Sequence, residues 1–294
     1  MYRFDLRGED ATKWSVKKIF SGSAGQPVTS APAVSRYAAN KYVVIFGTGS
    51  DVYQDDVGDK TRQAVYGIYD DLSLTEKEVT AATSGDLVEQ TLSETIDASG
   101  KTLREITSDN QIGDKKGWMV KLGEKDGERV VVKPTMILRT AVISTRIYDQ
   151  KVETSGGSGD PCSIDSHKTA TSSSSWILAL NAKTGGKLSK NDAYVNFLKA
   201  GKPALYYAGL KQEGITSFTY MDGSKTDDSP VTRDGDSGGS GTDQKYKAPN
   251  SEIPNNSCFS KKTVRVLLTN KNQSFGIGGR ICGLRRLSWR EVFD

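Results

Sequence analysis

The sequence has little of what would mark a metal-binding, redox or membrane-spanning protein. Its 294 residues include one histidine and three cysteines, and the cysteines show none of the close pairing that zinc sites and redox motifs need. No apolar stretch approaches the roughly 20 residues that cross a bilayer as a helix. The 40 basic and 36 acidic residues leave a net charge of +4 with no dense basic run, so nucleic acid is not expected as a partner.

Helical periodicity is also nearly absent, which excludes a helical bundle. What the chain has instead is 30 glycines, 8 prolines and many short runs of β-branched residues. This composition is typical of short strands joined by turns. We therefore predict an all-β protein.

Repeats subdivide the chain. Three segments share a start signal and predict repeats that begin near residues 28, 130 and 214: Val28–Val34, Val130–Met136 and Gly214–Tyr220. Further β-branched runs follow each start, and four strands per repeat is the geometry of a propeller blade. In the first repeat, strands near Val28, Tyr42, Ala64 and Trp118 are predicted to form one four-stranded antiparallel blade. The fold class is thus a partial β-propeller with long loop insertions.

The chain ends add a boundary prediction. Tyr2–Leu6 and Trp14–Phe20 resemble the last two strands of a blade, and Leu284–Phe293 resembles an outer strand. Residues 1–294 are accordingly interpreted as the C-terminal part of a single propeller domain with about three and a half blades. Further blades are expected upstream, and the open sides are expected to expose apolar strand faces.

Three insertions explain why the repeats are longer than single blades. Residues 71–116 contain two short strand-like runs around Asp97–Gly100 and predict an inserted hairpin. Residues 150–175 and 224–257 are rich in Gly, Ser, Asp and Lys and are predicted to be long mobile loops.

No segment predicts a catalytic, cofactor or metal site. His167 and Asp165 lie in a low-complexity stretch that could not hold a Ser-His-Asp triad rigidly. Gly47-Thr48-Gly49 is interpreted as a tight turn after a strand, because carboxylates follow where a phosphate would bind. Asp234–Gly238 begins like a calcium loop, but Lys245 stands at its twelfth position, where a bidentate glutamate belongs.

The cysteines leave two alternatives open. Cys258 and Cys282 flank the hairpin-like stretch Thr263–Arg280, so they are the candidate disulfide pair in an oxidising compartment. The alternative is that these two residues and Cys162 are buried free thiols.

An ordered set of phrases along nearly the whole chain resembles the C-terminal propeller of the PilC and PilY family. They are Gln26–Pro32, Val44–Gly49, Val65–Asp70, Lys116–Trp118, Glu128–Val130, Asp160–Ser163 and Leu287–Glu291. The resemblance implies a non-enzymatic module of a type IV pilus biogenesis and adhesion factor, which supports assembly by opposing retraction and contributes to attachment to surfaces or host cells. It also implies export through the periplasm to the outer membrane or pilus tip, a role in virulence, and pilin or tip subunits and a host-cell or abiotic receptor as partners. Some relatives carry a calcium loop in this domain, but no segment here matches it.

Two other functions compete. Trp176–Gly186 resembles the strand and turn of quinoprotein blades, which suggests a quinoprotein-like dehydrogenase, but the chain offers no carboxylate cluster with a catalytic base. A carbohydrate-binding propeller without a pilus role would require aromatic platforms on one face.

Overall fold

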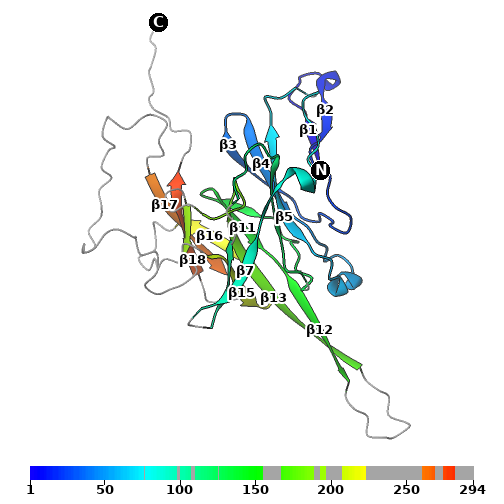
Figure 1. The fold of residues 1–294 in the computed structure, drawn as a ribbon, viewed down its shortest axis with the longest axis vertical. Coiled ribbons are helices and arrows are strands. Elements are labelled where there is room, and N and C mark those ends of the chain that lie inside the picture. Colours follow the sequence, from blue (N-terminus) through cyan, green and yellow to red (C-terminus); the bar gives the residue numbers. More distant parts are fainter. Residues whose placement is uncertain are drawn as a thin grey trace, which may run out of the picture.

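The computed structural model shows an all-β chain, as predicted (Figure 1). It describes residues 1–75, 77–97, 100–106, 110–124, 126–154, 167–188, 193–196, 207–222, 260–268 and 274–281. These residues form four sheets. The helices among them are short 3₁₀ turns: η1 (Ala11–Lys13), η2 (Gln54–Gly58) and η3 (Ser84–Asp86).

The first sheet contains the predicted first blade. Its strand order is β3 (Ala33–Ala38), β4 (Lys41–Gly47), β5 (Ala64–Asp71), β9 (Gly117–Lys121) and β6 (Val88–Gln90). The first four strands are antiparallel, and Trp118 lies in the same sheet as Ile45, so the prediction is confirmed. Two details differ. Val28 precedes the strand and makes an isolated bridge to Gly49, and β6 adds a fifth, parallel strand.

The second sheet receives a hairpin from the first repeat. Its order is β10 (Thr135–Ile137), β11 (Thr140–Ser144), β13 (His167–Asn181), β15 (Tyr207–Glu213), β8 (Thr102–Ile106) and β7 (Leu92–Ile96), with β12 (Ile147–Thr154) also paired to β13. The hairpin predicted around Asp97–Gly100 is confirmed as β7–β8. It pairs with β15, so the insertion joins one repeat to the next.

The prediction of a loop over residues 150–175 is wrong for 150–154 and 167–175. These residues belong to β12 and β13, which pair continuously from Ile147 opposite Ser174 to Thr154 opposite His167. Figure 1 shows the two strands as a ribbon that leaves the body of the molecule. The sequence prediction relied on hydrophobic alternation, which these polar residues lack. Main-chain pairing does not require apolar side chains, and threonine favours strands. Residues 224–257 lie outside the described residues.

Two smaller sheets complete the fold. The third sheet has the order β14 (Ala193–Asn196), β18 (Ser274–Ile281), β17 (Ser260–Leu268) and β16 (Phe218–Asp222). At the N-terminus, β1 (Tyr2–Asp5) and β2 (Ser15–Lys18) form a separate two-stranded hairpin. The division of the domain into repeats that begin near residues 28, 130 and 214, with insertions 71–116, 150–175 and 224–257, stays a prediction.

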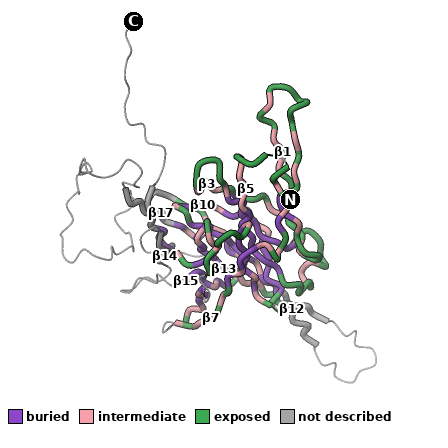
Figure 2. The backbone as a smooth tube through the Cα atoms, turned by 45° about the horizontal axis from the view of Figure 1, so that its top comes forward, coloured by how far each residue is buried: buried purple, intermediate pink, exposed green. Residues whose placement is uncertain are grey.

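Two core clusters lie on the two faces of the second sheet, and a third lies on the outer face of the first sheet, around Phe46 and Tyr66. Along β11, Ile143 packs in one cluster with Trp118 and Val65 of the first sheet, while Val142 packs in another with Val266 of the third sheet. This alternation stacks three sheets face to face, which is how blades pack in a propeller. Figure 2 shows the buried backbone concentrated in this central stack.

Trp118 fixes the distance between the first two sheets. It is fully buried, and its indole nitrogen donates a hydrogen bond to the Ala182 carbonyl at 3.2 Å. A Cβ at Gly67 or at Gly185 would overlap the indole ring. Gly185 also has a φ of +66°, a conformation that glycine adopts without strain. Small residues at these two positions therefore allow the tryptophan to lie between the sheets.

Candidate functional site

Of the site candidates that the sequence offers, the structure describes some and leaves others outside the described residues. His167 is the first residue of β13, opposite Thr154. Asp165, the loop Asp234–Gly238 and the three cysteines lie outside the described residues, so the Cys258–Cys282 disulfide stays a prediction. Within the described part of the chain, no group of three or more His, Cys, Asp or Glu residues is arranged to hold a metal ion.

The tight turn predicted at Gly47-Thr48-Gly49 is wrong: Thr48 extends the pairing of β4 with β5, because its amide donates to the Ala64 carbonyl at 3.0 Å, and Gly49 makes an isolated bridge to Val28. Thr48 is buried, and its hydroxyl accepts a hydrogen bond from the Ala64 amide at 2.9 Å. Gly47 lies against Val130, where a Cβ would overlap the valine side chain. These residues therefore continue the strand and pack against the next repeat, which is a structural role.

The loop that follows, residues 50–59, is built around one carboxylate. The Asp56 carboxylate accepts hydrogen bonds from the Ser50 hydroxyl at 2.6 Å, the Val52 amide at 2.8 Å and the Tyr53 amide at 2.9 Å. The Ser50 bond, followed by those from the two amides, lowers the pKa of Asp56. The loop thus has a fixed conformation of its own.

Arg129 holds the same 50–59 loop from beneath. Its buried guanidinium donates to the carbonyls of Ser50 at 2.9 Å and Asp59 at 2.8 Å, and also to that of Asp56. It lies 5.7 Å from the centre of the Tyr148 ring. Burying a cation is costly unless its donors are satisfied, and here backbone carbonyls satisfy them. Arg129 therefore ties together three points of the loop.

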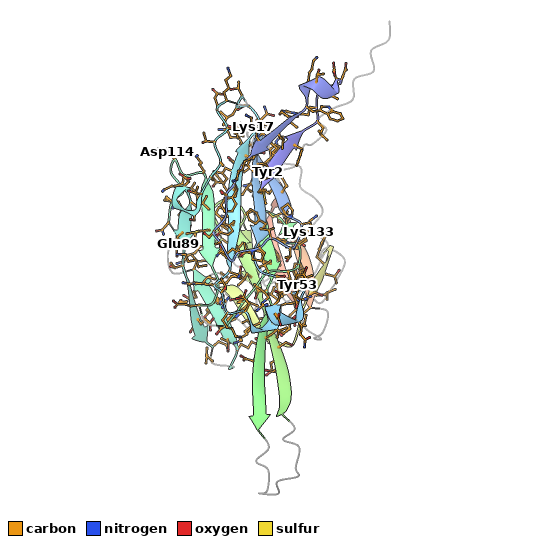
Figure 3. The ribbon with its side chains drawn as sticks, turned by 90° about the vertical axis from the view of Figure 1, so that its right-hand side faces the viewer. Tyr2, Lys17, Tyr53, Glu89, Asp114 and Lys133 are labelled. Carbon is orange, nitrogen blue, oxygen red and sulfur yellow. The ribbon has the colours of Figure 1, made fainter. Side chains whose placement is uncertain are left out.

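An ion pair with Arg146, which precedes β12, and a hydrogen bond from Tyr148 of β12 join the loop to the start of that strand. The Asp51 carboxylate accepts bonds from Arg146 and from the Tyr148 hydroxyl, both at 2.7 Å. The tip of this hydrogen-bonded loop presents Val52 and Tyr53 with 67% and 74% of their surfaces exposed, and Figure 3 shows Tyr53. An exposed aromatic residue on a fixed loop is a common feature of protein contact sites.

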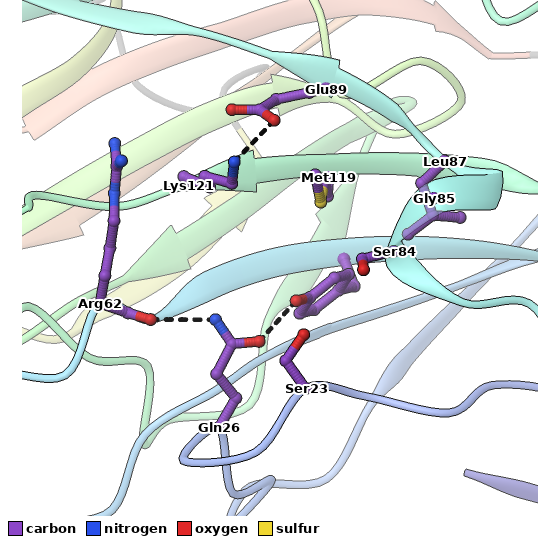
Figure 4. A pocket seen from close by; sticks show the side chains of 10 residues that line it. Ser23, Gln26, Arg62, Ser84, Gly85, Leu87, Glu89, Met119 and Lys121 are labelled. Atoms are coloured by element: carbon purple, nitrogen blue, oxygen red, sulfur yellow. Dashed lines mark hydrogen bonds and ion pairs between the residues drawn. The ribbon is translucent and has the colours of Figure 1, made fainter.

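A pocket opens on the outer face of the first sheet, which we call the outer pocket (Figure 4). Its volume is about 480 Å³, and it is lined by Ser23, Gln26, Arg62, Tyr66, Ser84, Gly85, Leu87, Glu89, Met119 and Lys121. Strands β5, β6 and β9 form its base, while the segment after β2 and the turn η3 form its walls. The volume falls in the ~300–1,000 Å³ range of small-molecule sites.

The polar groups of the outer pocket are held by one another. The Tyr66 hydroxyl donates to the Gln26 side-chain oxygen at 2.6 Å, and the Gln26 side-chain nitrogen donates to the Arg62 carbonyl at 2.9 Å. Across the pocket, Lys121 pairs with Glu89 at 2.8 Å. Burial raises the pKa of Tyr66, although its hydrogen bonds to Gln26 and Ser23 oppose the shift; the phenol therefore stays neutral at physiological pH.

The lining of the outer pocket offers hydrogen-bonding and charged groups around an apolar floor. Its two serines, Ser23 and Ser84, are the hydroxyl nucleophile candidates, but the lining contains no histidine to activate them, and its one carboxylate is paired with Lys121. A catalytic serine needs an oriented base within hydrogen-bond reach. Fixed donors and acceptors over a partly apolar floor instead suit a polar ligand.

Neither the 50–59 loop nor the outer pocket was predicted from the sequence. A signal existed for each, because Glu128–Val130 contains Arg129 and Gln26–Pro32 begins with Gln26. Both phrases contributed to the family resemblance without being given a role. Their partners, such as Asp59 and Tyr66, become neighbours only after the strands pair.

Comparisons with known proteins agree with this architecture. The family model of the PilY1 beta-propeller domain matches residues 1–104. The crystal structure of the Pseudomonas aeruginosa PilY1 C-terminal domain is similar over 72% of this chain and 46% of that chain, with 21% sequence identity and a TM-score of 0.51. No curated protein sequence matched the chain.

The fold is therefore that of a partial β-propeller, and the chain spans less than half the length of the similar PilY1 domain. The two findings support a C-terminal propeller of the PilY1 type, and the family resemblance found in the sequence is confirmed. Among the described residues, none of the helices is long and apolar enough to cross a membrane.

Proposed function

We propose that this chain is the propeller module of a type IV pilus biogenesis and adhesion factor. In this role it supports pilus assembly by opposing retraction, and it contributes to attachment to surfaces or host cells. The observation that carries the proposal is the family match over residues 1–104, together with the shared fold over most of the chain.

The described surface is compatible with a binding role. The 50–59 loop presents Tyr53 on a rigid support, and the outer pocket holds fixed polar groups without an activated nucleophile. Stacked sheets provide a stiff scaffold for such features, since loops carried on rigid elements are where binding sites concentrate. A quinoprotein-like dehydrogenase remains the alternative, and absorbance of a bound quinone in the purified protein would favour it.

The proposal includes a location and partners. The protein would reach the cell surface through the periplasm and act at the outer membrane or the pilus tip, as a contributor to virulence. Its partners would be pilin or tip subunits on one side and a host-cell or abiotic receptor on the other.

Deletion of the gene, followed by electron microscopy of surface pili, tests the proposal. Loss of pili is expected, and the same deletion in a strain without the retraction motor should restore them, because assembly would then be unopposed. The matched control is complementation of the first strain with the intact gene. Unchanged piliation in the deletion strain would contradict a biogenesis role, and pili still missing without the motor would contradict opposition to retraction.

A further inference from the structure

We infer that the outer pocket is a saccharide-binding site with a preference for sugars that carry a carboxylate. The inference rests on the proposed function, because it names the ligand class of an adhesion module. It starts from the position of the pocket, whose walls come from separate parts of the first repeat: the segment after β2, strands β5, β6 and β9, and the turn η3. Figure 4 shows Arg62 and Lys121 on one side of it, with Ser84, Gly85 and Leu87 on the other.

The floor and rim differ in chemistry. Tyr66, Leu87 and Met119 are buried beneath the opening and present carbon atoms to it. The rim carries hydroxyl, amide, carboxylate and ammonium groups from Ser23, Gln26, Ser84, Glu89 and Lys121. A sugar ring matches this combination, since its C–H groups can cover an apolar floor while its hydroxyls both donate and accept hydrogen bonds.

The rim is preorganised, which favours a polar ligand. Gln26 is fixed at both ends of its amide by Tyr66 and by the Arg62 carbonyl. Both side chains of the Lys121–Glu89 pair are partly exposed, Lys121 by 41% and Glu89 by 38%. A ligand can therefore reach both charges. Groups that are already oriented lose little conformational entropy when a ligand binds.

Arg62 supplies the preference for an acid. Its Nε donates to the Leu122 carbonyl at 2.9 Å, which orients the guanidinium, and it makes no ion pair among the described residues. With Lys121 balanced by Glu89, the lining has one excess positive charge. A planar guanidinium binds a carboxylate through two parallel hydrogen bonds. A uronic or sialic acid is therefore expected to bind more tightly than a neutral sugar of similar size.

The test uses purified protein of residues 1–294 and titrations followed by saturation-transfer NMR and calorimetry. Glucuronic, galacturonic and N-acetylneuraminic acids are the acidic probes, and glucose, galactose and N-acetylglucosamine are the neutral ones. Saturable binding of at least one acidic probe is expected, about tenfold tighter than binding of the neutral probes. If none of the acidic probes binds saturably, or if neutral probes bind more tightly, the inference is overturned.

A steric variant locates the binding. A Cβ at Gly85 meets the Thr83 hydroxyl at 3.9 Å, so a side chain can begin there without a backbone clash, and Gly85→Trp should fill the pocket and abolish binding. Gly58 has no neighbour within 4 Å of such a Cβ and does not line the pocket, so Gly58→Trp is the matched control and should bind as the unmodified protein does. Equal binding by both variants would overturn the assignment to this pocket.

A second variant tests the charge. Arg62→Gln should remove the preference for the acidic probes while keeping weak binding of neutral sugars; an unchanged preference would overturn the role of Arg62. Piliation is scored separately in the deletion strain. Sugar binding without any effect of the deletion on pili would contradict the pilus proposal alone, whereas loss of pili without sugar binding would contradict the saccharide inference alone.

Discussion

Two β-hairpins of this chain have similar strand lengths but very different surroundings. The β7–β8 hairpin pairs with β15 at the edge of the second sheet and buries Leu103 and Ile106. Among the described strands, β1 and β2 pair only with each other, and they leave Phe4 and Val16 exposed directly opposite each other. Apolar side chains alone therefore do not attach a hairpin to a sheet. The β7–β8 hairpin is attached because β15 offers a strand edge for pairing and because its leucine and isoleucine find a buried place.

The docked hairpin is fixed by a buried cation. Arg104, with 2% of its side chain exposed, pairs with the fully buried Glu128 and with the half-exposed Glu94, each at 2.8 Å. Its guanidinium also lies 3.9 Å from the centre of the Trp176 ring. The hairpin therefore connects three regions: its own strand β7, the segment before β10, and strand β13.

The free hairpin has a much smaller anchor. Its ion pair to the first sheet joins Arg3 with Asp70 of β5. The other face of the hairpin is apolar, with Tyr2, Phe4, Leu6, Trp14 and Val16 each more than half exposed. Figure 3 shows this hairpin, marked by Tyr2 and Lys17, at one end of the molecule. Exposed apolar patches of this kind are typical of interaction surfaces.

The largest effect is expected from breaking the buried pair. Arg104→Met should destabilise the fold by about 3–5 kcal/mol, because Glu128 would be left as an unpaired buried charge. Urea unfolding measures this, and Glu94→Gln is the control, with a loss below about 1 kcal/mol since that carboxylate is half exposed. Adding Glu128→Gln to Arg104→Met should recover part of the loss; no recovery would show that the buried charge is not the cause.

A matched pair of truncations compares the hairpins directly. Leu103→Ala on β8 should cost about 2–5 kcal/mol, as expected for a fully buried leucine. Phe4→Ala on β1 removes a larger side chain but should change stability by less than about 0.5 kcal/mol, because Phe4 is exposed. Equal losses in thermal or urea unfolding would mean that the β1–β2 hairpin is covered in solution.

Much of this contrast could not be predicted from the sequence. Alternation within short runs was enough to predict the first blade and the β7–β8 hairpin, because side-chain period and turn chemistry are local properties. The pairing of β8 with β15 joins residues about a hundred positions apart in the chain, Leu103 with Leu210, and no local pattern specifies such a contact. The same applies to Arg129 and Gln26, whose partners are distant carbonyls and a distant phenol. The β12–β13 ribbon was missed for the opposite reason, since its pairing is local but its polar sequence lacks hydrophobic alternation.

Self-association is the next test of the free hairpin. Phe4→Ser with Val16→Thr should raise the concentration at which the purified chain stays monomeric, because the change removes the central apolar pair of the exposed face. Analytical ultracentrifugation over a concentration series measures this. The control is Val52→Thr, which removes an exposed valine from the 50–59 loop instead. A similar shift for Val52→Thr would mean that removing any exposed apolar side chain has this effect, and that the hairpin face is not the association surface.

The smallest effect concerns the anchor of the free hairpin. Burial raises the pKa of Asp70, while Arg3 opposes that shift, so Arg3→Ala should raise the pKa of Asp70 further. Because the folded-state pKa lies above the unfolded one, the contribution of Asp70 to stability is full below the usual aspartate pKa of 3.8 and is lost as the pH rises through the folded-state value. Arg3→Ala should therefore destabilise the protein more at pH 7 than at pH 3, by about 1 kcal/mol. Carboxyl NMR titration of Asp70 measures the pKa, with Arg7→Ala as the control because Arg7 has a smaller influence on Asp70. A lower pKa in Arg3→Ala would show that the pair does not hold the hairpin in solution.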